Sequence, residues 1–180
     1  MVKNNKYSVN TTEPIPVNVV DPSTKKIWPA ELCHDSDGFF LKQSSDQAKD
    51  AELFLSPGWI DLHAHVLGIN GPVYDLPTTM TKLCAAGMDL VDVIEAVTAS
   101  PAEILQLDDW CNLRGKLHNA TLFKLSKSAP VSRKFIDCVG KEIFHEKYII
   151  PTAIINKEKM KWLDYPLKNV KVDVDPASNI

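Results

Sequence analysis

The sequence predicts an α+β fold in which strands near both ends of the chain flank a helical middle. Three observations support this prediction. Short apolar runs broken by turn formers occupy residues 15–55, helix signals occupy residues 77–107, and strand-like runs return after Lys116. A length of 180 residues with 44% hydrophobic composition allows one core of moderate size. We therefore expect one domain with poorly ordered terminal segments.

The first region, residues 15–55, has the pattern of short antiparallel strands. Residues 17–20 (VNVV) precede the turn formers 21–23 (DPS), and the turn formers 35–38 (DSDG) precede a second apolar run. Because Asp, Pro, Ser and Gly favour turns, each apolar run is predicted to be one strand.

Helix signals begin after Pro77. A first short helix, around residues 78–86, is expected to end at Gly87, which tolerates the left-handed conformation found just past a helix. A second helix is expected to begin with Asp89 as its N-cap residue. Its apolar residues have the i, i+3, i+4, i+7 spacing of a buried face: Leu90, Val93, Ile94 and Val97.

A third helix is predicted to start at Ser100. In this prediction Ser100 is the N-cap residue, Pro101 takes the first helical position, and Glu103 completes a capping box. Beyond Lys116 the strand-like runs follow in order: residues 121–125, 131–139, 144–150 and 154–155.

One motif carries candidate chemistry, residues 57–65 (PGWIDLHAH). From Ile60 onward it alternates as a strand does, so His63 and His65 would point to the same side and their ring nitrogens could meet one cation. Neutral imidazole is a good ligand for zinc and its neighbours. Two histidines on a strand can equally be a solvated or hydrogen-bonded pair, so the spacing alone leaves both interpretations open.

The motif resembles the start of the barrel in the amidohydrolase superfamily, where a Pro-Gly turn leads into the first strand and two histidines hold a divalent metal. Residues 71–80 (GPVYDLPTTM) and 96–102 (AVTASPA) are similar to the stretch after the last barrel strand in the dihydroorotase-like deacetylase branch. Residues 115–117 (GKL) and 120–123 (ATLF) resemble the return of those proteins to a small β-sandwich. The resemblance spans roughly residues 17–159.

This resemblance implies a small β-sandwich of N- and C-terminal strands plus two or three helices, the remnant of a (β/α)8 barrel. Only eight residues, 66–73, separate His65 from Tyr74, whereas a complete barrel needs on the order of 250 residues. The bridging lysine, the later histidine ligands and the aspartate that activates water in the family have no match here. The resemblance implies descent from a metal-dependent hydrolase of cyclic amide or N-acyl C–N bonds. It also implies that this chain is internally shortened and is catalytically inactive on its own.

Other polar residues near the motif are interpreted as structural. Asp75 is expected in a turn or as a helix cap, and Asp61 is expected to orient the strand or a ligand histidine rather than act as a base. Lys82, on the first helix, is no candidate for the bridging lysine, which the family places on a barrel strand. The remaining histidines are interpreted as structural or surface residues: His34, His118 and His145.

Metal binding is expected to be weak. Metal-assisted hydrolysis requires enough ligands, an open position for water, a base and a dry cavity, and His63 and His65 meet only part of the first requirement. We expect a partial zinc site at this pair, or none. The alternative function is a non-enzymatic β-sandwich remnant acting as an interaction or oligomerisation module. A third possibility is a coincidental match on an unrelated domain.

Composition and charge indicate which classes of partner and which cellular compartment to expect. The net charge is −3 and no basic block occurs, so nucleic acid is not expected. Residues 1–12 lack the apolar core of a signal peptide, and no stretch approaches the roughly 20 apolar residues of a membrane span, so we expect a cytoplasmic protein without a membrane partner. Self-association is expected through helix faces that the missing barrel leaves exposed, at these residues: Leu83, Val93, Ile94 and Val97.

The chain is expected to divide into a flexible N-terminal segment, residues 1–14, a single composite domain, residues 15–161, and a loosely ordered tail, residues 162–180. Four segments with different roles make up the composite domain: sandwich strands at 15–56 and 116–156, the first barrel strand with its H-x-H pair at 57–66, and helices at 77–107. The four cysteines stand far apart and are expected to be reduced residues of the core.

Overall fold

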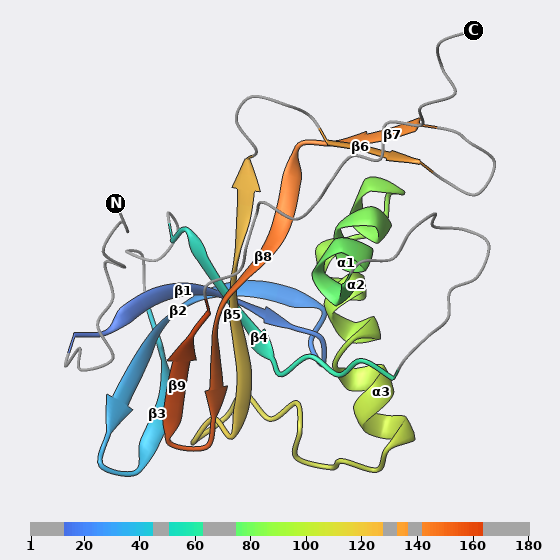
Figure 1. Ribbon diagram of the computed structural model, residues 1–180. Coiled ribbons are helices and arrows are strands. Elements are labelled where there is room, and N and C mark those ends of the chain that lie inside the picture. The colour runs from blue at the N-terminus through green and yellow to red at the C-terminus, as the bar shows by residue number, and fades with distance from the viewer. Residues whose placement is uncertain (1–12, 45–50, 63–74, 128–132, 137–141, 164–180) are drawn as a thin grey trace, which may run out of the picture.

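The computed structural model describes residues 13–44, 51–62, 75–127, 133–136 and 142–163. Within these ranges the chain forms an α+β fold with a seven-stranded sheet, a two-stranded sheet and three helices (Figure 1). The predicted fold class is confirmed at this level. In Figure 1 the helices, drawn in green, lie together on one side of the sheet.

The elements alternate along the chain as predicted, with strands at both ends and helices between them. In chain order they are β1 (Ile15–Asp21), β2 (Lys26–Asp35), β3 (Gly38–Gln43), β4 (Leu53–Pro57), α1 (Leu76–Ala85), α2 (Leu90–Ala96), α3 (Ala99–Ile104), β5 (Asn119–Lys127), β6 (Arg133–Ile136), β7 (Glu142–His145), β8 (Lys147–Asn156) and β9 (Lys159–Trp162). The large sheet has the strand order β3-β2-β1-β4-β5-β8-β9, and β6 pairs with β7 in the small one.

The N-terminal strands are antiparallel where they form hairpins. β1 pairs with β2 and β2 with β3 in antiparallel register, as expected from the turn formers between them. β4 departs from the expectation, because it pairs with β1 in parallel, with Val19 opposite Leu55. Its other neighbour is β5, which it meets in antiparallel register, with Leu55 opposite Leu122. β4 therefore runs in the same direction as β1 and in the opposite direction to the C-terminal strand β5.

The sheet curls so that its two ends approach each other. Phe40 of β3 forms an isolated bridge with Lys116, and the Leu117 N–H donates to the Phe39 carbonyl at 2.7 Å. Gly38 lies beside Glu158 in the turn between β8 and β9. Where the resemblance implied a small sandwich, the strands from both ends of the chain form one curled sheet.

One face of the curled sheet encloses the first core. It takes alternate residues of each strand, as the period of two requires. Its fully buried side chains come from both ends of the sequence and include Val17, Val19, Ala30, Leu53, Leu55, Leu117, Leu122 and Ala153. Strands that are far apart in the sequence thus depend on the same core.

The opposite face of the sheet and the helices form the second core. Val20, Phe123 and Ile149 from the sheet meet Met80 of α1 and the buried side of α2. A hydrogen bond joins the layers, because the Thr81 hydroxyl accepts from the Ile149 N–H at 3.1 Å.

The helix residues predicted to be exposed are buried or partly buried, and self-association itself stays a prediction. Val93 and Ile94 are 0% exposed and Val97 is 6% exposed, because they pack on the sheet in the second core, where Leu83 also makes contact. The helices use the sheet itself to cover their apolar faces. No barrel is needed to bury these residues.

The start of α1 agrees with the sequence-based prediction, and the start of α3 differs from it. Asp75 is the N-cap residue of α1, and its carboxylate accepts from the Thr78 N–H at 2.7 Å, which confirms the predicted capping role. Gly87, with φ of +100°, follows α1 in the left-handed region, as predicted. Asp89 takes the N-cap position of α2, also as predicted.

The N-cap residue of α3 is Thr98, and the predicted Ser100 cap is wrong by two residues. The last turn of α2 leads directly into α3, and the Ala102 N–H donates to the Thr98 carbonyl at 3.0 Å. The first turn of α3 therefore begins at Thr98 and already contains Ser100. The single strand predicted at 144–150 is also interrupted, since β7 ends at His145 and β8 begins at Lys147.

Candidate functional site

The predicted ligands His63 and His65 lie outside the described residues, so their geometry stays a prediction. The structure describes the approach to them, residues 51–62. This approach consists of β4, the Pro-Gly-Trp turn and three further residues.

The Pro-Gly-Trp turn is fixed from two sides. The Gly58 N–H donates to the Asn119 carbonyl at 3.2 Å, and the Gly58 carbonyl accepts from the Trp110 indole N–H at 2.7 Å. A Cβ at position 58 would lie 3.2 Å from the Asn119 Cβ and 3.3 Å from the Trp110 ring. Glycine fits here because a Cβ would be a few tenths of an ångström too close to both neighbours.

Trp59 anchors the same turn to the second core. Its indole N–H donates to the buried Ser56 hydroxyl at 2.9 Å, and its ring lies 5.6 Å from that of Phe123. Aromatic pairs at this separation contribute beyond the area that they bury. The turn that leads toward the histidines therefore has a fixed direction.

The strand predicted from Ile60 does not form in its described part, because residues 60–62 belong to no strand. The Ile60 N–H donates instead to the Val97 carbonyl, at the end of α2, at 2.7 Å. A strand needs a neighbour to pair its backbone groups, and this N–H finds its partner at a helix end instead. Beyond this bond Asp61 and Leu62 are exposed.

The described residues do not complete a metal site. Within the described ranges, no group of three or more His, Cys, Asp or Glu side chains is placed to hold a metal ion. Asp75 follows the unplaced segment, and its carboxylate caps α1. The donor set that the structure describes therefore does not fit a catalytic zinc, which needs three protein ligands and an open position.

The other candidate residues lie on separate elements. His34 of β2 packs against Phe39, with ring centroids 4.5 Å apart, and His118 lies in the connection before β5. His145 ends β7, where burial, followed by the charge of Lys147, lowers its pKa. Lys82 lies on α1, as predicted, and burial lowers its pKa.

The described cysteines are free, as predicted, but none of them is fully buried in a core. Cys33, Cys84 and Cys111 are free thiols of intermediate burial. Burial raises the pKa of each, and that of Cys84 rises to about 11. The thiols therefore remain protonated near neutral pH, which disfavours a role as nucleophile.

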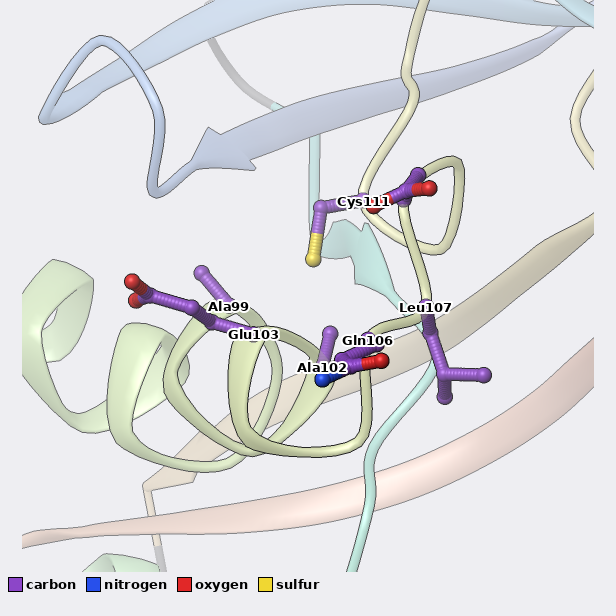
Figure 2. A pocket seen from close by; sticks show the side chains of 7 residues that line it. Ala99, Ala102, Glu103, Gln106, Leu107 and Cys111 are labelled. Atoms are coloured by element: carbon purple, nitrogen blue, oxygen red, sulfur yellow. The ribbon is translucent and has the colours of Figure 1, made fainter.

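A hollow of about 320 Å³ opens beside α3 (Figure 2). Its walls come from α3 and the loop that follows: Ala99, Ala102, Glu103, Gln106, Leu107, Asp108 and Cys111. No sequence motif had pointed to this region. The signal that could have found it is the run EILQLDD at residues 103–109, which combines three large apolar residues with three acidic ones.

Among the helices in the described ranges, none has the length and apolar character needed to cross a membrane.

Comparison with known proteins identifies deacetylases over short segments. The chain is 50% identical over 48 residues to Deacetylase Atu3266 of Agrobacterium fabrum, covering 27% of this chain and 11% of the relative. It is 51% identical over 66 residues to a deacetylase of Brucella anthropi, covering 36% of this chain and 16% of the relative. This chain resembles the amidohydrolase superfamily over part of its length. The resemblance inferred from the sequence motifs is thus confirmed.

Further comparisons agree on the limited extent of this amidohydrolase likeness. A deacetylase of Enterococcus faecalis is 47% identical over 57 residues, which is 31% of this chain and 15% of the relative. No family model matches the sequence. Among solved structures, a dihydroorotase has a TM-score of 0.43 with 29% identity over 51% of this chain and 24% of its own. An adenine deaminase has a TM-score of 0.45 with 32% identity over 52% of this chain and 25% of its own. The chain spans between 11% and 16% of the length of these curated relatives.

Proposed function

We propose that this chain is a non-catalytic, internally shortened relative of the amidohydrolase deacetylases, which keeps their first metal-ligand pair, His63 and His65. One observation carries the proposal. The chain is about half identical to deacetylases over short segments, yet eight residues stand between His65 and Tyr74 where the family has its barrel. The reaction of the parent enzymes would be hydrolysis of an N-acyl or cyclic amide C–N bond.

The chemistry supports loss of that reaction. Hydrolysis by a bound metal requires a cation that stays bound, a coordinated water, a base for its proton and a cavity that excludes bulk water. Two imidazoles supply at most two ligands, and a two-ligand zinc site exchanges its metal readily with buffer. Asp61, the nearest described carboxylate in the sequence, lies exposed rather than inside a cavity.

The described packing supports a remnant that folds without its barrel. Both faces of the curled sheet bury continuous apolar clusters. The Ile60 N–H, which would bond to a neighbouring strand in a barrel, bonds to the Val97 carbonyl. This backbone group ahead of the deletion thus has a partner in the shortened chain.

A zinc titration tests the retained ligand pair. Wild type is stripped of metal and titrated with Zn²⁺ beside His63→Ala/His65→Ala and the matched control His34→Ala/His118→Ala, which removes two histidines from other elements. We expect weak binding that the first double variant abolishes and the control retains. Equal zinc binding by all three proteins would contradict a retained ligand pair.

A second candidate function is an interaction module. The observation that favours it is the exposure of Ile104, Leu105 and Leu107 at the end of α3, at 71%, 47% and 37%. Most other large apolar residues in the described ranges are buried or half-buried. Limited proteolysis in the presence and absence of a binding partner would map protection to this region if the module is real.

A further inference from the structure

The end of α3 presents an unusual surface. All seven residues from Glu103 to Asp109 are exposed, and three of them are the large apolar residues Ile104, Leu105 and Leu107. Single exposed apolar side chains are ordinary, but three within four residues are a concentration that marks contact sites.

A specific backbone arrangement holds this segment in place. Gln106 has φ of +55°, and the Leu107 N–H donates to the Ala102 carbonyl at 2.8 Å, which closes the helix end in the pattern of a Schellman motif. In such motifs the residue at the position of Leu107 commonly packs back on the helix. Here Leu107 instead forms part of the wall of the 320 Å³ hollow. The apolar surface is therefore presented by a defined turn.

The hollow beside this turn has the size of an anchor site. Ligand cavities in proteins range from about 300 to 1,000 Å³, so this one suits a side chain better than a large ligand. Ala99 and Ala102 form its floor on α3, and Figure 2 shows the Cys111 sulfur directed from the loop toward this helix. Because burial raises the pKa of Cys111, its thiol is uncharged and contributes a neutral part of the lining. Side chains inserted into such hollows dominate the affinity of many interfaces.

The charge around the hollow has one sign. Glu103 and Asp108 line it, Asp109 follows, and Asp21 lies close enough to act on the Cys111 thiol. Of the described residues that line it, none is basic. The whole chain carries only −3, so this rim is a local concentration of negative charge. It favours a cationic partner and raises the rate of its approach.

We propose that the end of α3 and the following loop form a docking surface for a basic segment of another protein. An apolar side chain of that segment occupies the hollow, and its lysine or arginine side chains lie beside Glu103 and Asp108. A second copy of this chain fits less well, because a two-fold pair would place identical acidic rims against each other. The docking surface goes beyond the proposed loss of catalysis and does not depend on metal binding at His63 and His65.

Fluorescence anisotropy with designed peptides tests this surface. The probe is a labelled peptide of alternating leucine and lysine pairs, compared with one carrying glutamate for lysine and one carrying serine for leucine. We expect the leucine-lysine peptide to bind wild type at least about tenfold more tightly than either counterpart, a difference of about 1.4 kcal/mol. Comparable binding of the serine-lysine peptide would overturn the anchor role of the hollow.

Matched variants locate the binding. Glu103→Lys/Asp108→Lys should weaken the leucine-lysine peptide at least about tenfold, whereas Glu13→Lys/Asp37→Lys, with the same charge change on other elements, should stay within about twofold. Ile104→Ser/Leu107→Ser should weaken it as well, with an unchanged melting temperature because both side chains are partly exposed. Equal losses in the two charge variants, or no loss in either, would overturn the proposal. The proposal would also be overturned if analytical ultracentrifugation showed that wild type is a dimer and the serine variant a monomer. The docking surface would then be occupied by a second copy of this chain.

Discussion

The two faces of the curled sheet bury their apolar residues in different ways. The first core is enclosed by the sheet alone, with Val17 and Leu55 from the N-terminal part against Leu122 from the C-terminal part. The second core needs the helices, with Val93 and Ile94 of α2 against Phe123. The first core therefore depends on pairing between distant strands, and the second on docking of local elements. Together they show how a chain without a barrel can still bury both faces of its sheet.

The largest expected effect is on the first core. Leu55→Ala removes a side chain that is 0% exposed on a strand between β1 and β5, where neighbours on both sides limit collapse into the cavity. We expect a loss of about 3–5 kcal/mol in the free energy of unfolding. Urea denaturation followed by circular dichroism measures it. Hydrogen exchange should rise in strands from both ends of the chain, and a rise confined to β4 would contradict a shared core.

A smaller effect is expected in the second core. Ile94→Ala removes a side chain that is 0% exposed on the seven-residue helix α2, which can shift to fill part of the cavity. We expect a loss of about 2–4 kcal/mol in the free energy of unfolding. Hydrogen exchange should increase in α1 and α2 more than in β1 and β2. An equal increase in all four elements would mean that the two cores do not differ in cooperativity.

Gly58 tests how Trp110 and Asn119 fix the approach to the histidines. Gly58→Ala places a methyl group 3.2 Å from the Asn119 Cβ and 3.3 Å from the Trp110 ring, and should cost about 1–3 kcal/mol of unfolding free energy. In a Trp110→Leu background, which removes the ring, the same substitution should cost measurably less. Thermal denaturation of the four proteins gives the coupling. An unchanged cost in the second background would exclude the ring as the cause.

The smallest effect is a stabilisation at the end of α3. Gln106 has φ of +55°, a conformation that costs a residue with a side chain roughly 1 kcal/mol and glycine little. Gln106→Gly should therefore raise the free energy of unfolding by up to about 1 kcal/mol. The control Gln106→Ala keeps the conformational cost and should give no such gain. A melting temperature lower in the glycine variant than in the alanine variant would contradict the assignment.

Much of the fold was predictable because its signals are local. Turn formers between apolar runs located β1 to β3, and Asp75 and Gly87 marked the ends of α1. The parallel pairing of β1 with β4 and the curl of the sheet were not predictable, because they join residues far apart in the sequence. The cap of α3 was misplaced at Ser100, since the Thr98 carbonyl already accepts the first bond of that helix.

For the candidate site, the sequence supplied a prediction of two metal ligands, which stays a prediction, and a family likeness. The H-x-H motif and the family likeness came from the sequence, and the likeness to deacetylases is confirmed. Residues 60–62, the described part of the strand predicted from Ile60, belong to no strand, because alternation shows which face a residue would take and not whether a neighbouring strand exists. The bond from Trp110 to Gly58 joins residues 52 positions apart, which no local pattern reveals.

Turnover tests the central claim most directly. Purified chain, stripped of metal and reloaded with Zn²⁺, is assayed for hydrolysis of N-acetyl amino acids and dihydroorotate beside His63→Ala/His65→Ala and a metal-only blank. We expect all three rates to be equal, because the barrel that would complete the ligand set and the pocket is missing from the sequence. Zinc-dependent hydrolysis by wild type above the blank, lost in the double variant, would contradict a non-catalytic remnant.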